Sequence, residues 1–208
     1  LYAAHMNLAQ QAYDNHYIRR GLELLTTHLP DPDREDLRGF EWYYLWRQWH
    51  KDVFTLPHSG VCYRVAFSPD GTMLAAGGEG TTVKLWDTAT GRLRIVLKGH
   101  TKWVSSVAFS PDGKLLASGS ASSDQPGQLI LWDVAAGQHL ATLGGHTYGI
   151  HCIAFSPNGK TLATASSAGY SLKDLRGEVK LWNVATREQE LTLGGHTRGV
   201  TSVAFSPD

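Results

Sequence analysis

Histidine and serine recur together in this chain, and with an aspartate they are the residue types of a hydrolytic triad. His100 and Ser118 form one such pair, and His146 and Thr164 form another in a later stretch. A nucleophilic serine is typically carried on a strained turn such as G-x-S-x-G, and no such turn is present. Because the pair recurs at equivalent positions, we predict that it is structural and that the chain has no catalytic residues.

The ten histidines do not form a metal-binding motif. There is no H-x-x-x-H pair and no cysteine-rich pair with ligand spacing, and His146 and His151, five positions apart, are unsuited to share a zinc ion. The glycine-rich run 77–80 reads as a connection between two strands, which is not the strand-to-helix context of a phosphate loop. We therefore expect neither a metal ion nor another cofactor.

The paired histidine and serine or threonine residues belong to a sequence pattern that repeats along the chain. The stretch 99–133 contains a Gly-His pair, an apolar run that ends in AFSPDG, a second apolar run, and a third that ends in Trp-Asp. Similar copies occupy 58–87 and 146–183, and a fourth begins at His196 and stops at Asp208. The His-to-Phe spacing is always 9 residues, whereas the link from the following Leu to the Trp grows from 12 to 16 to 20. Only one connection in the repeat therefore changes in length.

Each repeat predicts four short strands. In the second copy they lie at 104–110, 115–119, 129–133 and 139–143, and they are apolar enough to be buried on both faces. The Ser-Pro-Asp-Gly sequence at 110–113 is typical of a tight turn, with Pro at the second position and Gly at the fourth. Four-stranded units that recur after 42, 46 and 50 residues indicate radial or stacked repetition.

The first fifty residues have a helical pattern. Apolar residues recur at spacings of three and four over 2–13 and again over 18–29, which predicts a helical hairpin. A third helix is predicted from Asp31 to about His50. Six aromatic residues surround its second half, so we expect it to pack on two sides, against the hairpin and against the repeats. A ligand-stacking platform is the alternative.

The Gly-His pairs, the SPDG turns and the Trp-Asp endings resemble the WD40 family of β-propellers over residues 51–208. The resemblance implies a mainly β fold: a partial WD40-type propeller with three four-stranded blades plus extra strands, preceded by an α-helical segment. We predict two domains, an α-helical one at 1–50 and the WD40 repeats at 51–208. Residues 53–56 resemble an outermost strand whose own blade is missing, and the fourth copy stops early, so we expect a fragment of a larger propeller.

In this family each blade contains a hydrogen-bonded set of His, Ser or Thr, Trp, and an Asp from a turn. Burial of these polar groups costs free energy unless they pair with one another. Ala76 replaces the hydroxyl in the first repeat, so its set should be incomplete. Asp124 and Asp174 are the candidates for the Asp, in turns whose register the sequence does not settle. By position, the resemblance assigns the structural network to His100, Ser118, Trp132, His146, Thr164 and Trp182.

The two lengthened connections, 121–127 and 168–177, should open on the same rim as the His-containing loops. Trp, Tyr and Arg are the residues most enriched in interaction hot spots. One residue of these types lies two or three positions after each of His100, His146 and His196. The alternative is that both connections are tolerated surface loops and that Trp103 packs against its own blade. The predicted contacts of a protein or peptide partner are Lys102, Trp103, Tyr148, Arg198, Tyr170, Lys173 and Arg176.

Charge and hydropathy narrow the kinds of partner. Nineteen basic and nineteen acidic residues leave no net charge, so we expect no nucleic-acid partner. No apolar run reaches the roughly 18 residues that span a bilayer, so we expect no membrane segment in this chain. Cys62 and Cys152 belong to repeats that are not neighbours, so we expect no disulfide, and a reducing compartment such as the cytoplasm is permitted.

Together these features predict a non-catalytic protein–protein interaction scaffold. The sequence DLRGFEWYYLW, just before the first repeat, resembles a segment of large bacterial WD40 proteins, some of which carry a Ser/Thr protein kinase domain upstream. The alternative is therefore a regulatory or sensory region of a bacterial Ser/Thr protein kinase whose catalytic domain lies outside these residues. The coding DNA upstream of Leu1 would distinguish the two.

Overall fold

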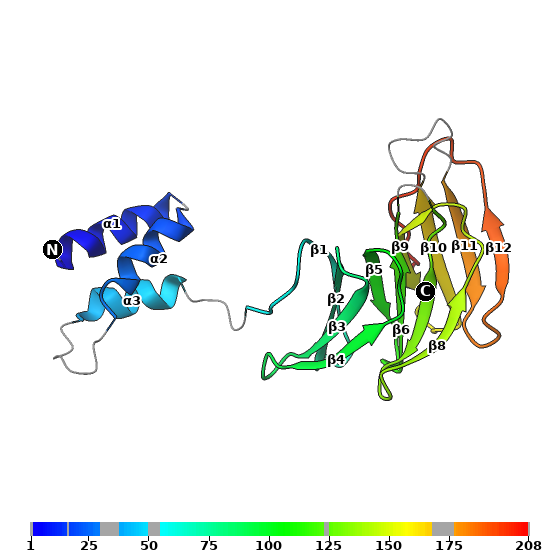
Figure 1. Cartoon of the computed structure of the whole chain (residues 1–208), viewed down its shortest axis with the longest axis horizontal. Helices are drawn as coiled ribbons and strands as arrows, with labels where there is room; N and C mark the ends of the chain where they lie inside the picture. The colour runs from blue at the N-terminus through cyan, green and yellow to red at the C-terminus, as the bar shows by residue number, and fades with distance from the viewer. Residues whose placement is uncertain are drawn as a thin grey trace. The chain divides into compact units, whose positions relative to one another are not determined.

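The computed structural model describes residues 2–15, 17–29, 38–49, 55–122, 125–167 and 177–207. The chain divides into two compact units, Leu1–Thr55 and Leu56–Asp208. The first unit is helical and the second consists of three sheets (Figure 1). The predicted fold class, mainly β with a helical segment before it, is confirmed.

Three helices form the first unit: α1 (Tyr2–Asp14), α2 (Ile18–Thr26) and α3 (Phe40–Trp49). α1 and α2 follow one another across a short turn and pack together, and α3 contacts both. The Trp42 indole N–H donates to the Leu25 carbonyl over 2.9 Å, which ties α3 to α2. The apolar core of this unit consists of Met6, Ala9, Leu25, Trp42 and Leu45.

The described part of α3 begins at Phe40, later than the predicted start at Asp31. The Gly39 carbonyl accepts the Trp42 N–H at 3.1 Å, and Gly39 itself is not helical. Residues 30–37 lie outside the described part of the chain. Within this unit the hairpin covers one side of α3, and three aromatic side chains remain exposed: Phe40, Tyr43 and Tyr44.

The second unit contains three four-stranded antiparallel sheets, which we term blades one, two and three. In each blade, strands that follow one another in sequence pair in space. Blade one comprises β1 (Cys62–Phe67), β2 (Met73–Gly78), β3 (Thr82–Asp87) and β4 (Leu93–Lys98). Blade two comprises β5 (Val104–Phe109), β6 (Leu115–Ser120), β7 (Leu129–Asp133) and β8 (Gln138–Leu143). Blade three comprises β9 (Gly149–Phe155), β10 (Thr161–Ser167), β11 (Glu178–Asn183) and β12 (Gln189–Leu193).

A Ser-Pro-Asp-Gly turn joins the first and second strands of blades one and two, and Ser-Pro-Asn-Gly takes its place in blade three. In blade two the Ser110 hydroxyl donates to Asp112 Oδ1 at 2.6 Å, and the Gly113 N–H donates to the Ser110 carbonyl at 2.9 Å. Gly113 has a φ of 71°, a left-handed conformation that glycine adopts without strain. In blade three Asn158 Oδ1 accepts the Ser156 hydroxyl at 2.8 Å, so an amide also supports this turn.

The turn between the third and fourth strands also places one residue in the left-handed region. Gly91 and Gly137 occupy this position in blades one and two, with φ values of 65° and 63°. Blade three has Arg187 there, with a φ of 64°, and it is the one non-glycine residue of the described chain with a positive φ. Its Nη1 donates to the Leu140 carbonyl of blade two at 3.3 Å, so the strained residue also contacts the neighbouring blade.

The hydrophobic core of the second unit lies between the blades. Leu85 and Val104 belong to a cluster shared by blades one and two, and Leu131 and Ile150 belong to a cluster shared by blades two and three. Gly119 permits close packing, because a Cβ there would lie 2.7 Å from Ile150 Cγ2. The strands β6 and β7 of the central blade are consequently buried on both faces, as the sequence predicts.

The extra strands do not appear in the described residues. Of the expected strand 53–56, the first two residues lie outside the described part, and Thr55 and Leu56 are not in a strand. The fourth copy, 196–207, also contains no strand, although the Val200 N–H donates to the Ser166 carbonyl of blade three at 3.1 Å. A first strand needs a second strand beside it to complete its hydrogen bonds, and the described residues provide none after position 200.

Candidate interaction surface

A buried hydrogen-bonded set in blade two joins His100, Ser118 and Trp132. The Ser118 Oγ lies 2.6 Å from His100 Nε2, and the Trp132 indole N–H donates to the same oxygen at 2.7 Å. The three residues come from the loop before β5, from β6 and from β7. The set therefore connects the His-containing loop to the middle of its blade.

Blade three repeats this arrangement with a threonine. Thr164 Oγ1 lies 2.6 Å from His146 Nε2 and accepts the Trp182 indole N–H at 2.8 Å. The other ring nitrogen, His146 Nδ1, lies 3.2 Å from Glu178 Oε1. Both nitrogens of this imidazole are therefore paired.

Both histidines of these sets are neutral near pH 7. Burial lowers the pKa of His100 to about 4, with a smaller contribution from His139. Burial also lowers the pKa of His146, and the Glu178 carboxylate opposes this effect only in part. The contact between His146 and Glu178 is therefore a hydrogen bond from Nδ1–H to a carboxylate, and not an ion pair.

The arrangement is unsuited to nucleophilic chemistry. Ser118 and Thr164 are completely buried, so no substrate can reach their oxygens. Each oxygen already accepts an indole N–H and lies 2.6 Å from an imidazole nitrogen, so its hydrogen-bonding capacity is used within the set. The set instead pairs three polar groups whose burial would otherwise cost free energy.

A further polar position, four residues before each Trp, also holds the His-containing loops. Gln128 Oε1 accepts the Thr101 N–H at 3.1 Å, and Glu178 Oε1 accepts the Thr147 N–H at 3.1 Å. Sequence reasoning missed this position, although its constant spacing to the Trp was a usable signal. The two Asp candidates of the network lie outside the described residues: Asp124 and Asp174.

Blade one lacks the complete set. Ala76 stands at the hydroxyl position, and Trp86 Nε1 and His58 Nδ1 have no hydrogen-bond partner among the described residues. Trp86 is nevertheless fully buried. Blade one therefore leaves its indole N–H unpaired, whereas blades two and three pair theirs. The Nδ1 atom of His100 in blade two, like that of His58, has no partner among the described residues.

The loops that follow the histidines lie beside the connections between second and third strands. In blade two the Ala121 N–H donates to the Trp103 carbonyl at 3.1 Å. At the other end of this connection, the Gly127 N–H donates to the Tyr148 carbonyl at 3.0 Å. One connection is thus bounded by two successive His-containing loops. We define the His-loop rim as residues 101–103, 147–148 and 197–198.

Blade three extends this surface in the same way. The Gly177 N–H donates to the Arg198 carbonyl at 3.1 Å. A Cβ at Gly177 would lie 2.4 Å from the Val200 nitrogen, so only glycine permits this approach without a shift of the backbone. The His-loop rim is therefore a continuous edge across blades two and three.

The predicted contact residues differ in exposure. Trp103 is 39% exposed and Arg198 is exposed, whereas Lys102 and Tyr148 are partly buried. Trp103 is the largest exposed apolar side chain on the rim. The remaining predicted contacts lie outside the described residues: Tyr170, Lys173 and Arg176.

Other kinds of site receive no support from the described residues. No group of three or more His, Cys, Asp or Glu in the described ranges could hold a metal ion. Cys62 is exposed, Cys152 is buried, and both are free thiols. Of the helices that the structure describes, none has the length and apolarity needed to cross a membrane.

Comparison with solved structures shows similarity to WD40 proteins. A structure of U3-55K and a crystal structure of the RRP9 WD40 repeats each align with a TM-score of 0.62 and 28% identity over 70% of this chain. The alignments cover 43% and 42% of those chains. The similarity therefore concerns part of a propeller.

Sequence relatives give the same result. An uncharacterised WD repeat-containing protein of Nostoc sp. (strain PCC 7120) is 47% identical over 47 residues, which are 23% of this chain and 3% of that protein. The nuclear distribution protein PAC1 of Tuber melanosporum is 38% identical over 74 residues, 36% of this chain and 16% of that protein. The chain thus matches only a small part of each relative.

The family model of the WD domain, G-beta repeat, matches residues 50–87, 91–133, 137–183 and 187–208. These matches cover all three blades and the residues that follow them. This chain belongs to the WD40 repeat family.

Proposed function

We propose that this chain is a non-catalytic interaction module and that a protein or peptide partner binds its His-loop rim. WD40 repeat proteins generally act as protein-interaction scaffolds. The main support within this chain is Trp103, which is 39% exposed on a loop whose backbone is bonded to Ala121. An aromatic side chain on a loop whose backbone is held in place offers a large apolar contact at a small cost in conformational entropy.

Neighbouring side chains support the same surface. Tyr148 lies at the far end of the connection that begins at Ala121, and Arg198 continues the rim in blade three. Aromatic residues and arginine are the types that contribute most to binding at protein interfaces. Lys102 and Arg198 add positive charge, so acidic residues in the partner would be favoured.

A pull-down with the full chain tests this proposal. Trp103→Ala combined with Tyr148→Ala should reduce capture of the partner at least tenfold, because truncation of an interface aromatic costs about 2 kcal/mol or more. Arg92→Ala is a matched control, since Arg92 is an exposed residue in the turn at the opposite end of blade one. Unchanged capture by the double variant would refute the proposed surface.

Beyond the segment DLRGFEWYYLW, no observation favours the kinase-associated alternative. The relatives described above are WD repeat and nuclear distribution proteins, and neither name refers to a kinase. Sequencing the coding DNA upstream of the codon for Leu1 tests this alternative directly. A kinase domain with its catalytic Asp and Asn would make this region part of an enzyme, without making the blades catalytic.

A further inference from the structure

A groove opens between blades one and two at the end opposite the His-loop rim. β5 starts beside that rim and ends at the Ser-Pro-Asp-Gly turn, so the turns mark the other end of the strands. The groove has a volume of about 830 Å³. We term it the turn-rim groove; its lining comes from residues 68–70, 73, 94–95, 111–114 and 133–135.

The floor of the turn-rim groove is apolar. Met73, Ile95 and Val134 line it, and all three pack into the core shared by blades one and two. Pro69 and Pro111 add apolar surface from the two turns. The floor is therefore packed against the core and suited to the methylene groups of a bound side chain.

Three carboxylates stand around this floor: Asp70, Asp112 and Asp133. Hydrogen bonds from Ser68 and Thr72 lower the pKa of Asp70, and those from Ser110 and Lys114 lower the pKa of Asp112. Both side chains are consequently charged at neutral pH. These are bonds within the turns, and they hold the carboxylates in place.

Two of these carboxylates retain a free oxygen. Asp112 Oδ1 accepts the Lys114 N–H at 3.1 Å, and Asp133 Oδ1 accepts the Ala136 N–H at 2.8 Å. No described residue donates to the Oδ2 atom of either side chain. The turn-rim groove therefore presents two unpaired acceptors that carry negative charge.

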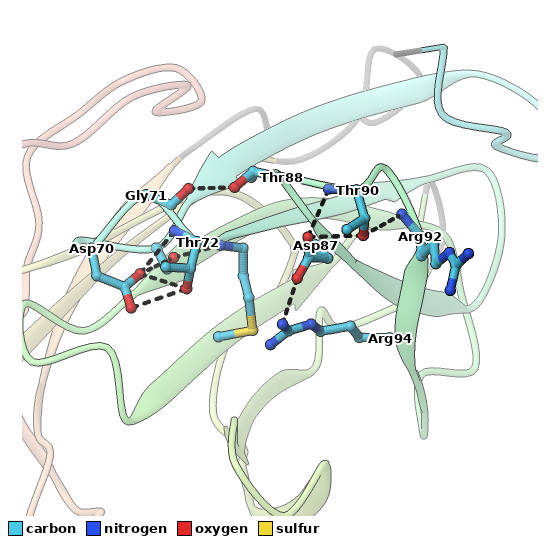
Figure 2. Close-up of polar contacts among 10 residues, drawn as sticks. Asp70, Gly71, Thr72, Asp87, Thr88, Thr90, Arg92 and Arg94 are labelled. Atoms are coloured by element: carbon cyan, nitrogen blue, oxygen red, sulfur yellow. Dashed lines mark hydrogen bonds and ion pairs between the residues drawn. The ribbon is translucent and has the colours of Figure 1, made fainter. Parts of the chain in front are cut away.

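The positive charges near the groove are fewer and one is already compensated. Figure 2 shows the Arg94 guanidinium directed at the Asp87 carboxylate, with which it forms an ion pair. The same view shows Asp70 bonded to Thr72 within its turn. Lys114 is the other cation of the lining. Negative charge is therefore in excess.

The equivalent groove between blades two and three has the opposite charge. Its volume is about 480 Å³, and its charged lining residues are Lys160 and Arg187. Asn183 takes the position that Asp133 has in blade two, and no carboxylate is part of this lining. The negative charge is thus a specific feature of the turn-rim groove and is not imposed by the blade geometry.

We propose that the turn-rim groove binds an extended peptide segment of a partner protein in which an arginine or lysine lies next to an apolar residue. The methylene groups of the basic side chain would lie on the apolar floor, and its cation would pair with Asp112 and Asp133. The apolar neighbour would fill the remaining space beside Ile95. This site is separate from the His-loop rim and does not depend on it.

Fluorescence anisotropy with the full chain and two labelled peptides tests the proposal. The probe is Ala-Leu-Arg-Leu-Ala, and the comparison peptide has Glu in place of Arg. The arginine peptide should bind at least tenfold more tightly, and added salt should weaken its binding. Asp112→Asn combined with Asp133→Asn should reduce its affinity about tenfold, as expected for the loss of two partly exposed ion pairs.

The chain itself shows that these substitutions are compatible with the fold. Asn158 and Asn183 occupy the two positions in blade three, and Asn183 Oδ1 accepts the Ala185 N–H at 3.0 Å. Glu188→Gln with Glu190→Gln is the matched control, because it changes the net charge equally on exposed residues outside the groove lining. This control should bind the arginine peptide as the unmodified chain does.

A second variant tests whether added negative charge strengthens peptide binding. Lys114→Glu adds a negative charge to the lining and should increase affinity for the arginine peptide severalfold. Equal binding of the two peptides, or unchanged binding by the double Asn variant, would overturn the proposal. An equal loss of peptide affinity in the Glu188 and Glu190 control would show that only the net charge of the chain matters. That result would also overturn the proposal. The Trp103 and Tyr148 double variant should bind the peptide normally, which separates this site from the proposed function.

Discussion

A single hydroxyl on the second strand decides whether a blade can pair its buried indole and imidazole. Ser118→Ala removes the oxygen that contacts both Trp132 Nε1 and His100 Nε2. We expect the free energy of unfolding to fall by about 1–3 kcal/mol, because two buried polar atoms lose their partner. Denaturant unfolding at neutral pH, followed by tryptophan fluorescence, measures this change.

Blade one provides the reciprocal variant for the same prediction. Ala76→Ser places a hydroxyl where Trp86 Nε1 has no partner among the described residues. This substitution should raise the free energy of unfolding by about 1 kcal/mol. If Ser118→Ala has no effect, or if Ala76→Ser destabilises the protein, the hydroxyl does not have the stabilising role that the geometry indicates.

The neutral state of His100 should also make stability depend on pH. Its pKa is about 4 in the folded chain and has the ordinary value of 6.5 when unfolded. Between these values the unfolded chain binds a proton that the folded chain does not. The free energy of unfolding is therefore independent of His100 titration above pH 6.5. It falls as the pH decreases toward 4, and protonation of His100 accounts for up to about 3 kcal/mol of this decrease.

Unfolding experiments over this pH range check the prediction, and His100→Gln should reduce the slope. The lowered pKa values of Asp70 and Asp112 do not affect the same window. Their contribution is present above the unfolded pKa of 3.8 and is lost only as the pH falls through their lower folded pKa. A wild-type free energy that stays constant from pH 7 to about pH 4.5 would contradict the assignment of a neutral buried histidine.

At the scale of elements, the repeat made the strands predictable. The turn at 110–113 and Trp132 locate the strands around them, and β5 to β8 agree with prediction to within one residue at each end. The start of α3 was predicted less well than the strands, because Gly39, and not the predicted start Asp31, precedes its first described turn. Helix boundaries depend on such local hydrogen bonds, which apolar periodicity does not reveal.

The hydrogen-bond partners within the blades were predictable only where the residue type was specific. Serine or threonine on the second strand and Trp on the third identified the oxygens and indoles that pair. Glu178 was missed because the family pattern points to an Asp in the preceding turn, whereas this longer side chain reaches the loop from the strand itself. The charge contrast between the two grooves was also hidden, since it arises from residues far apart in the sequence.

At the scale of the whole molecule, the same strand position differs sharply between blades. Val65 in blade one is 53% exposed, whereas Val107 in blade two is 4% exposed and Ile153 in blade three is 6% exposed. The preceding blade covers the latter two, and no described strand covers Val65. Phe67 is 64% exposed on the same strand. Blade one is therefore stabilised by one interface between blades and blade two by two.

This asymmetry predicts that residues 1–208 in isolation are poorly stable and that blade one unfolds first. Exposed apolar side chains on β1 should bind the dye ANS, and thermal unfolding should be broad, because each blade depends on its neighbours. Val65→Thr should reduce dye binding with little change in the midpoint, whereas Val107→Thr should lower the midpoint because it places a hydroxyl in the core between blades. A sharp cooperative transition at high temperature, with equal effects of the two substitutions, would show that β1 is covered in solution.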